Sequence, residues 1–478
     1  MSMLTFTKFN SIVLAAGLLL SAVQAHAAET DCLSRDPSTI VKRNGTYWIY
    51  GTGTGTQQYS SKDRIHWTFR GPALKSAPNW VASAVPGNTI NKVWAPDIRY
   101  FNRVYHLYSA YSCWGSASSG INLSTSTDLN PNTWQNQGLV VRTTPKSGAN
   151  AIDPCIFQDS NGTPWLSYGS YFSGIKLIKL DFKTGKSDPT DTATYNIATR
   201  PGIAVNPIEA SCVTLHDGYF YLFVNWDFCC RGRKSNYNIR FGRSKLVTGP
   251  YLDKHGHDME HGGGSLFLAA VNDDGSGRPS DDEVGPGHVG ILHDTGGDWV
   301  TTCYEWAHDK DGRTTVNINK LVWDTDGWPR VVHDPGPFEL QSFDATHEAL
   351  SVRFAVHHTT SLQMEPARAD KGQLWEVRYR GEGFYSIAQA NGGNVLTGVE
   401  TTPAANTPLT LMPFTGSKSQ LWYASQNDDG TYSFKNTARE GSMSIGITDC
   451  SINDGAVVQE TKSTDEACQK WMFRRPQR

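Results

Sequence analysis

Asn44-Gly-Thr-Tyr-Trp-Ile-Tyr50 is a turn that leads into a run of aromatic and β-branched residues, and the chain repeats this pattern. A tight Asn-Gly or Asp-Gly turn before such a run is typical of an antiparallel hairpin. Four copies follow one another at spacings of 58, 59 and 56 residues, and a less perfect fifth follows after 79. Five units of this size predict an all-β domain, a five-bladed β-propeller. The later copies are Asn102-Arg-Val-Tyr-His-Leu-Tyr108, Asn161-Gly-Thr-Pro-Trp-Leu-Ser-Tyr168, Asp217-Gly-Tyr-Phe-Tyr-Leu-Phe223 and Gly296-Gly-Asp-Trp-Val-Thr-Thr-Cys-Tyr304.

The position eight residues before each turn carries an unusual set of side chains. In a propeller the innermost strands of all blades converge on a central channel, so equivalent positions should line it. A single acid before a turn is more often a solvated strand end. The shared register of the five copies favours a site around the channel instead. The five residues are Asp36, Trp94, Asp153, Glu209 and His288.

A second repeat with a different period occupies the C-terminal part of the chain. Three Gln-x-Trp signals, separated by 47 and 49 residues, each follow an alternating apolar run. Three lobes of this length are specific for a β-trefoil and resemble the ricin-type lectin modules. We expect the Gln and Trp side chains to be core residues. In sugar-binding relatives an Asp follows a short apolar strand, and the matching positions here are Thr397 and Gly446. The three signals are Gln373-Leu-Trp375, Gln420-Leu-Trp422 and Gln469-Lys-Trp471.

These patterns divide the chain into three parts. Residues 1–27 contain Lys8, a nine-residue apolar run and Ala25-His26-Ala27, which is the pattern of an export signal. The run is too short to span a membrane, which needs about 20 apolar residues. We expect a secreted protein, extracellular or periplasmic, with a propeller over residues 28–340 and a trefoil, interpreted as a carbohydrate-binding module, over residues 341–478.

Nine cysteines follow the export signal, so they are expected in an oxidising compartment where disulfides persist. Cys450 and Cys468 lie close together near the C-terminus and are the first candidate pair. Cys229 and Cys230 are adjacent, and their spacing leaves their partners open. An odd count leaves at least one thiol unpaired within the chain.

Composition excludes several classes of protein. Charged residues are only 19% of the chain, with 45 Gly and 23 Pro, which does not fit a coiled coil or a disordered protein. Lys and Arg number 43 against 46 Asp and Glu, and no basic stretch could neutralise a series of phosphates, so we expect no nucleic-acid partner. We also expect no membrane partner and a monomeric protein.

Paired carboxylates in an aromatic-lined channel suit hydrolysis of a glycosidic bond. One acid must protonate the leaving oxygen while another acts at the anomeric carbon. An aspartic-protease dyad is disfavoured because the residues around Asp36 and Asp153 do not resemble that family. A Ser-His-Asp hydrolase is disfavoured because the sequence has no Gly-x-Ser-x-Gly elbow.

Several segments resemble the family 43 glycoside hydrolases, and among them the arabinanases. The resemblance extends over most of residues 30–332, and the Cys-Cys-Arg-Gly and Gly-Pro-Gly-His segments are its most specific parts. Two positions depart from it, since the relatives usually have His at Arg35 and commonly Pro at Ser211. The matching segments are Arg35-Asp-Pro-Ser38, Val93-Trp-Ala-Pro-Asp-Ile98, Ala151-Ile-Asp-Pro154, Ile208-Glu-Ala-Ser211, Phe228-Cys-Cys-Arg-Gly232, Gly249-Pro-Tyr-Leu-Asp-Lys254 and Gly285-Pro-Gly-His288.

The resemblance implies an inverting hydrolase of α-1,5-linked arabinan or arabino-oligosaccharides. By the same resemblance, Asp36 would be the general base, Glu209 the general acid, and Asp153 the residue that positions Glu209 and raises its pKa. Trp94 and Trp114 would be sugar-stacking platforms, and His288 would hold a hydrated Ca²⁺ or other cation. Asp97 lies three residues beyond the channel position, and we interpret it as structural.

Three alternatives remain open at this point. The first is another activity of the same family, an exo-acting α-L-arabinofuranosidase or a β-xylosidase. The second is a retaining enzyme of the fructan type, which also has five blades and Asp-Pro landmarks. The third is a non-catalytic lectin whose working part is the trefoil.

Overall fold

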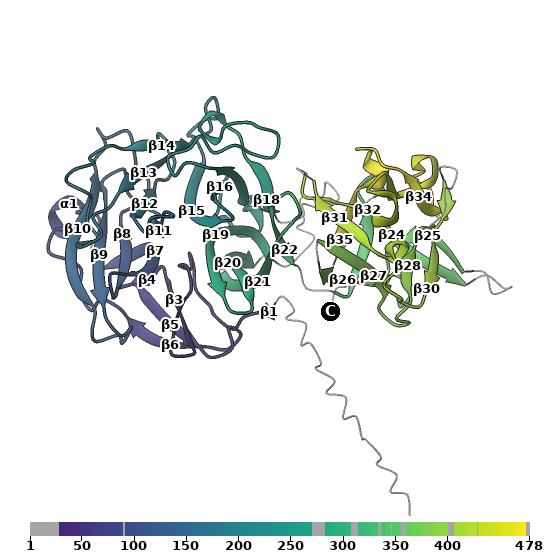
Figure 1. Ribbon diagram of the computed structural model, residues 1–478, viewed down its shortest axis with the longest axis horizontal. Coiled ribbons are helices and arrows are strands. Elements are labelled where there is room, and N and C mark those ends of the chain that lie inside the picture. The colour runs from purple at the N-terminus through teal and green to yellow at the C-terminus, as the bar shows by residue number, and fades with distance from the viewer. Residues whose placement is uncertain are drawn as a thin grey trace, which may run out of the picture.

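The computed structural model describes residues 28–88, 91–269, 283–306, 314–332, 336–345, 347–354, 360–381, 383–399, 406–427 and 429–474. Two β domains lie side by side, a five-bladed propeller and a trefoil (Figure 1). The fold class predicted from the repeats is therefore confirmed. Residues 1–27, to which the export signal was assigned, lie outside the described residues. In the described part of the chain, no helix has the length and hydropathy needed to cross a membrane.

Each blade is an antiparallel sheet whose first strand is innermost (Figure 1). The first blade contains β2 (Val41–Arg43), β3 (Thr46–Gly51), β5 (Gln57–Ser61) and β6 (Trp67–Pro72). The second contains β7 (Lys92–Phe101), β8 (Val104–Tyr111), β9 (Ser119–Ser126) and β10 (Gln135–Thr143), with β4 (Gly53–Thr54) beside β7. The third contains β11 (Cys155–Gln158), β12 (Pro164–Tyr168), β13 (Ile175–Lys179) and β14 (Tyr195–Ala198).

The last two blades complete the ring. The fourth contains β15 (Ile208–His216), β16 (Tyr219–Trp226), β17 (Asn238–Ser244) and β18 (Ser265–Ala269). The fifth contains β19 (Glu283–Asp294), β20 (Gly297–Trp306), β21 (Thr314–Trp323) and β22 (Pro329–Val332), and β1 (Ala28–Glu29) also pairs with β21. The short helices of this domain are α1 (Val81–Ala84), η1 (Gly232–Lys234) and η2 (Met259–His261).

The turns of the five sequence repeats all fall at the same place in the fold. Each joins the first and second strands of a blade, which confirms the hairpins expected from the sequence. Asn44, Asn102 and Asp217 adopt positive φ angles of 48°, 47° and 45° there. Asn and Asp tolerate this left-handed conformation better than other side chains, so the turn residues set the register of each hairpin.

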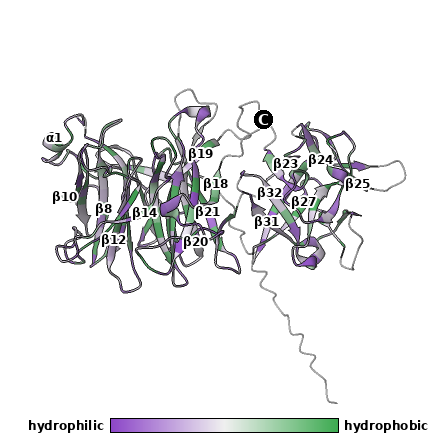
Figure 2. Ribbon diagram, turned by 90° about the horizontal axis from the view of Figure 1, so that it is seen from above, coloured by the Kyte–Doolittle hydropathy of each residue, from purple (hydrophilic) through white to green (hydrophobic). Residues whose placement is uncertain are grey.

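Neighbouring blades are held together by separate apolar clusters. For example, Ile98 and Leu107 of the second blade pack with Tyr50 of the first, and Leu292 of the fifth blade packs with Ile49 of the first. Similar clusters join the second blade to the third, the third to the fourth and the fourth to the fifth. Hydrophobic and hydrophilic residues are mixed along the strands (Figure 2), and strands such as β8 and β16 are buried at nearly every position, as expected for sheets packed between neighbouring blades. The ring of clusters fixes where the inner strands point.

The trefoil begins a few residues earlier than expected. Strand β23 (Phe338–Ser342) contains the expected boundary at residues 340 and 341, and it pairs with three strands of the trefoil. The other strands are β24 (Glu348–Phe354), β25 (Thr360–Pro366), β26 (Leu374–Gly381), β27 (Phe384–Gln389), β28 (Val395–Thr397), β29 (Thr407–Pro408), β30 (Thr410–Met412), β31 (Trp422–Gln426), β32 (Tyr432–Asn436), β33 (Met443–Ile447), β34 (Val458–Lys462) and β35 (Trp471–Arg474). The short helices are η3 (Lys418–Gln420), η4 (Thr437–Arg439), η5 (Thr448–Cys450) and η6 (Ala467–Gln469).

The three Gln-x-Trp signals make the same contacts in each lobe. Trp375, Trp422 and Trp471 are buried, and their indole N–H groups donate to the carbonyl oxygens of Leu350, Leu396 and Ile445 at 2.8, 3.2 and 3.1 Å. The preceding Gln side chains are also buried. Each donates to a backbone carbonyl seven residues earlier and accepts from a backbone N–H five residues earlier, so each closes a loop onto the core. These six residues are core residues, as predicted.

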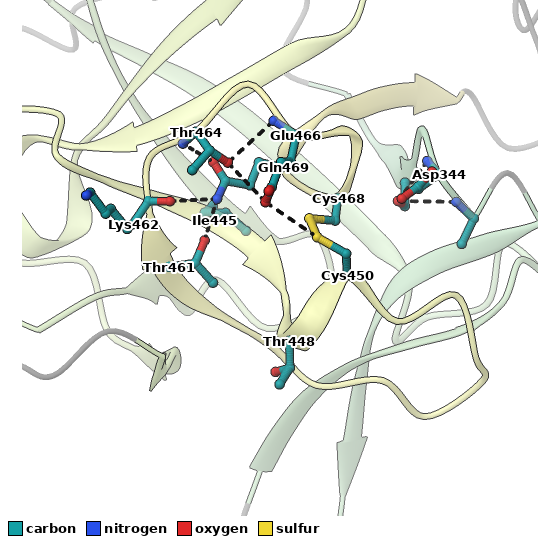
Figure 3. The surroundings of a disulfide bond; sticks show 12 residues. Asp344, Ile445, Thr448, Cys450, Thr461, Lys462, Thr464, Glu466, Cys468 and Gln469 are labelled. Atoms are coloured by element: carbon teal, nitrogen blue, oxygen red, sulfur yellow. Dashed lines mark hydrogen bonds between the residues drawn. A yellow bond between two sulfur atoms is a disulfide. The ribbon is translucent and has the colours of Figure 1, made fainter.

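Cys450 and Cys468 form the predicted disulfide, with Gln469 of the third lobe beside it (Figure 3). The bond joins η5 to η6 and fixes the end of the third lobe. All nine cysteines are among the described residues, and the other seven are not joined by a disulfide in the structure.

Strand β22 of the propeller meets β31 of the trefoil (Figure 1). The guanidinium of Arg330 lies 3.9 Å from the Tyr423 ring, donates to the carbonyl of Ala424 and pairs with Asp324 at 3.3 Å. A small cavity of about 70 Å³ beside it is lined by residues of both domains, among them Lys254, Phe267, Tyr385 and Gln426. The two domains therefore share a packed junction built around one half-buried arginine.

Candidate active site

The five predicted channel residues occupy equivalent places at the start of the inner strands. Trp94, Glu209 and His288 lie in β7, β15 and β19, and Asp36 and Asp153 lie a few residues before β2 and β11. A left-handed backbone residue occurs at or next to this position in every blade, at Asp36, Ala95, Asp153, Ala210 and His288. In β7, β15 and β19 it coincides with a β-bulge. Bulges re-aim side chains, so the same local device takes the residue out of the regular strand alternation in these three blades.

A residue at the far end of the following hairpin holds the Asp36 side chain. The Asp36 carboxylate accepts a hydrogen bond from the Thr52 hydroxyl at 2.5 Å, and the same hydroxyl accepts from the backbone N–H of Ala95 at 2.9 Å. Thr52 lies eight residues after the first turn, as Asp36 lies eight before it. The contact therefore joins the first blade to the second beside the carboxylate.

Asp153, which is buried, and Glu209, which is half-buried, form a pair of carboxyls. One Asp153 oxygen accepts from the backbone N–H of Ala210, the residue after Glu209, at 3.1 Å. Burial raises the pKa of Asp153 well above its ordinary value, and the negative charges of Glu209 and Asp36 raise it further. Burial also raises the pKa of Glu209, and the charge of Asp36 acts in the same direction. The pair therefore holds a proton at a pH where two carboxyls in water would both be ionised.

Two hydroxyl groups hold the Glu209 side chain. Ser170 donates to one carboxylate oxygen at 2.7 Å and Tyr237 donates to the other at 2.9 Å. Both hydrogen bonds favour the ionised form and lower the pKa of Glu209, against the effect of burial. A hydroxyl can also accept, so both contacts remain possible when Glu209 is protonated.

The Gly-Pro-Gly-His segment makes room for Tyr237. A Cβ atom at Gly287 would lie 2.4 Å from the Tyr237 ring, so only glycine fits there. The buried Asn225 side chain holds the same segment, donating to the Pro286 carbonyl at 3.0 Å and accepting from the His288 N–H at 3.0 Å. The segment thus fixes both His288 and the tyrosine that contacts Glu209.

Asp97 is buried and accepts backbone N–H groups from two neighbouring blades. Thr39 of the first blade donates to one oxygen at 2.8 Å, and Ile156 of the third donates to the other at 2.9 Å. These bonds give Asp97 the structural role expected of it.

Trp94 and Trp114 lie together at the second blade. Their ring centroids are 5.7 Å apart with the planes inclined by 60°. Trp94 is half-buried against the cluster that contains Ile152, next to Asp153, whereas Trp114 is 80% exposed. An exposed indole beside a half-buried one offers apolar faces to a sugar ring.

His288 is buried, and burial lowers the pKa of its imidazole although the charges of Asp36 and Asp97 oppose the shift. The ring is therefore neutral at neutral pH, which is the form that binds metals. Its backbone N–H donates to the Asn225 side chain, which fixes the residue beside the channel. A buried, neutral imidazole can serve as a cation ligand.

The repeats did not point to Thr52, Ser170, Asn225 or Tyr237. Three of them had a usable signal, because residues at equal distances before and after a turn face each other across a hairpin. Glu209 pairs with Asn225 and Trp94 with Ala110 in this way. Thr52 faces Asp36 by the same rule. In the third blade the turn is one residue longer, so Ser170 lies one residue beyond the position equivalent to Thr52. Tyr237 comes from a separate loop and has no such signal.

The trefoil lacks the Asp of sugar-binding relatives in all three lobes. In each lobe the equivalent position directly follows the residue whose backbone carbonyl accepts the hydrogen bond from the core tryptophan. These positions hold Ser351, Thr397 and Gly446. The sequence had indicated only the last two of these positions. At Gly446 a side chain would collide with Thr461, which lies 2.7 Å from a Cβ placed there.

Comparison with known proteins agrees with this arrangement. The family model for glycosyl hydrolases family 43 matches residues 31–329, which is most of the propeller and more than half of the chain. The chain belongs to glycosyl hydrolase family 43. A model for the ricin-type beta-trefoil lectin domain-like family matches residues 371–461. This family 43 protein is therefore a glycoside hydrolase that carries a trefoil.

Relatives of this family 43 protein include enzymes with different printed activities. An extracellular endo-alpha-(1->5)-L-arabinanase of Bacillus subtilis (strain 168) is 40% identical over 332 residues, covering 68% of this chain and 97% of the relative. An extracellular exo-alpha-(1->5)-L-arabinofuranosidase of Cellvibrio japonicus (strain Ueda107) is 35% identical, covering 67% and 92%. The solved structure of a GH43 endo-arabinanase from Bacillus licheniformis is 37% identical with a TM-score of 0.58, covering 64% of this chain and 99% of that one.

Proposed function

We propose that this protein is a secreted enzyme that hydrolyses the α-1,5-L-arabinofuranosidic bonds of arabinan with inversion at the anomeric carbon. The observation that carries the proposal is the convergence of three carboxyls from three blades beside a pair of tryptophans. Two of these carboxyls, Asp153 and Glu209, have raised pKa values. Membership of family 43 and the relatives that act on arabinan or are named as arabinosidases support the substrate. The extracellular relatives support secretion.

In this mechanism Glu209 is the general acid. Its raised pKa keeps a proton available for the leaving arabinosyl oxygen, and Ser170 and Tyr237 hold the carboxyl in one orientation. Asp153 positions Glu209 through the hydrogen bond that it accepts from the backbone N–H of the next residue, Ala210. Asp36, fixed by Thr52, is the general base that takes a proton from the attacking water. Trp94 and Trp114 bind the sugar through its apolar faces.

The roles are tested with Asp36→Asn and Glu209→Gln proteins, which keep the size of each side chain. We expect both to lose at least about 100-fold in kcat on linear arabinan, because each removes a proton-transfer group. Glu209→Gln should lose much less activity on an aryl arabinofuranoside, whose phenolate leaves without a proton, whereas Asp36→Asn should lose activity on both substrates. The matched control is Asp217→Asn, an exposed residue at the turn of the β15–β16 hairpin. Wild-type rates in either site variant would contradict the mechanism.

Stereochemistry and cleavage mode are read from the first products. Proton NMR should show an inverted anomer, whereas a retained one would indicate the retaining alternative. The exo-acting alternative has specific support in the Cellvibrio japonicus relative. We propose endo action, for which early products from linear arabinan are oligomers of mixed length. A single product length from the start would favour exo action.

We propose that His288 holds a hydrated cation, Ca²⁺ or another, in the channel. One imidazole is a poor match for a hard cation, so water molecules would supply most of the other ligands. When bound, the ion would add positive charge near Asp36. We expect about one equivalent of metal in the purified protein and a lower Tm after dialysis against a chelator, and neither effect in a His288→Ala protein. A metal-free wild-type protein would contradict this proposal.

A further inference from the structure

The loop between β16 and β17 carries two adjacent cysteines at the edge of the carboxyl cluster. The Sγ atoms of Cys229 and Cys230 are 2.7 Å apart. Non-bonded heavy atoms in contact lie roughly 3.5–4 Å apart, whereas an S–S bond is about 2.05 Å long. The backbone therefore already brings the two sulfur atoms closer than contact distance. The pair also lies in the Cys-Cys-Arg-Gly segment, to which the mechanism assigns no role.

Contacts of the pair connect it to the site. The Arg35 guanidinium donates to Cys230 Sγ at 2.9 Å, and Arg35 directly precedes Asp36. A hydrogen bond with Cys230, burial and the negative charges of Glu209 and Asp36 together raise the pKa of Cys229 well above its ordinary value. The two thiols thus differ in their exposure to solvent, because Cys230 is exposed and Cys229 is half-buried near the carboxyls.

We propose that Cys229 and Cys230 are a dithiol–disulfide site that closes to a vicinal disulfide by exchange with a small-molecule disulfide such as oxidised glutathione. The exposed Cys230, as thiolate, attacks one glutathione sulfur, the glutathione disulfide bond breaks and one glutathione thiolate leaves. Cys229 then gives its proton to solvent and attacks Cys230 Sγ, which releases the second glutathione. Two protein thiols are oxidised, one glutathione disulfide is reduced to two thiols, and both protein protons leave.

Closure of this disulfide would fix the rim of the site. The two ends of the loop are already held, because Phe228 and Asn236 exchange hydrogen bonds of 3.1 and 3.2 Å and the Arg231 N–H donates to Ser235 at 2.9 Å. Within the loop, Cys230 contacts Arg35, and a disulfide removes the rotational freedom of both cysteine side chains. We expect closure to lower KM for arabinan, a consequence that rests on the proposed function.

The site itself is tested by mass spectrometry of the full mature protein. The protein is equilibrated with oxidised or reduced glutathione, quenched in acid, denatured, alkylated and digested without reductant. In oxidised glutathione the peptide containing Cys229 and Cys230 should carry no alkyl group and weigh about 2 Da less than the dithiol. In reduced glutathione it should carry two alkyl groups.

Two other cysteine pairs of the same chain are internal controls. The peptides of Cys450 and Cys468 should remain disulfide-linked in oxidised glutathione. Cys155 and Cys212 are both buried between the third and fourth blades, so they should be alkylated after denaturation in either buffer. Two alkyl groups on Cys229 and Cys230 in oxidised glutathione, or a disulfide from either one to a third cysteine, would overturn the proposal.

The consequence for the site is tested with Cys230→Ser, which keeps a hydrogen-bond acceptor for Arg35 and cannot form the disulfide. Reduction of the wild type should raise KM for arabinan several-fold with little change in kcat, and the variant should not respond to the redox buffer. A wild-type KM that is the same in both buffers would overturn the coupling to the site. The mass measurement needs no substrate, so failure of the arabinan proposal would leave the test of the disulfide intact.

Discussion

Glu209 illustrates how single contacts set the chemistry of the site. Burial and the charge of Asp36 raise its pKa, while the Ser170 and Tyr237 hydroxyls lower it. The balance leaves a carboxyl that is protonated at a higher pH than a carboxyl in water but is not locked in that form. The acid of a glycosidase needs this intermediate position, because it must release its proton and recover it in each cycle.

Replacing Tyr237 with Phe changes this balance in a known direction. The variant loses a hydrogen bond that favours the ionised form, so the pKa of Glu209 should rise and the acid should stay protonated to higher pH. We expect the alkaline limb of the kcat/KM profile to move to higher pH by up to about one unit. The control is Tyr195→Phe on β14, the outer strand of the third blade. An alkaline limb that moves to lower pH or does not move would contradict the assigned role.

The hairpin formed by the first two strands of a blade is the element that builds the site. Its turn fixes the register, and its far end places one side chain from each strand at the channel. Asp36 and Thr52, and Glu209 and Asn225, are such pairs. In the second blade the same ends bring Trp94 to the channel and Trp114 to the surface shortly after β8. The carboxyls proposed as catalytic and Trp94 therefore come from the same structural position in different blades.

Trp114→Ala tests the contribution of the second blade to substrate binding. Because the exposed indole offers a face for stacking and carries no proton, we expect KM for arabinan to rise several-fold with kcat nearly unchanged. Phe69→Ala removes another exposed aromatic side chain, on the outer strand of the first blade, and should leave both constants unchanged. A loss confined to kcat would argue against a stacking platform.

At the scale of the whole molecule, the trefoil is packed against the last blade of the propeller. Asp324, which pairs with Arg330, is itself buried and accepts backbone N–H groups from Asp326 and Trp328 at 3.1 and 2.7 Å. Arg330 therefore contacts both the turn before β22, through Asp324, and the trefoil strand β31, through the Ala424 carbonyl. The junction therefore gives the trefoil a structural contact with the propeller.

Arg330→Ala should weaken the junction between the two domains and leave the residues at the channel unchanged. The variant leaves the Asp324 carboxylate without its cation and the Ala424 carbonyl without its donor, so we expect a loss of about 1–3 kcal/mol in the free energy of unfolding. Calorimetry should show a lower Tm, and kcat at 25 °C should be close to that of the wild type. Arg368→Ala, which removes an exposed arginine of the trefoil, is the control. An unchanged Tm would mean that the junction contributes little to stability.

The sequence by itself determined the two repeat architectures, the core role of the Gln-x-Trp residues and the equivalent places of the five residues that precede the turns. These features depend on turns and alternation within contiguous residues, and such local patterns fix hairpin register before any tertiary contact forms. It also indicated the Cys450–Cys468 pair, because the two residues are close in the chain.

Only the tertiary structure decided which side chains surround each carboxyl. Tyr237 reaches Glu209 from a loop, Ser170 reaches it from the neighbouring blade, and Arg35 meets Cys230 across almost 200 residues of chain. The raised pKa values follow from burial, which depends on how complete blades pack around the axis. Arg330 likewise acquires its role only when the trefoil docks. Contacts between distant segments are set by packing of whole domains, and for those of Tyr237, Arg35 and Arg330 no local pattern in the sequence records them.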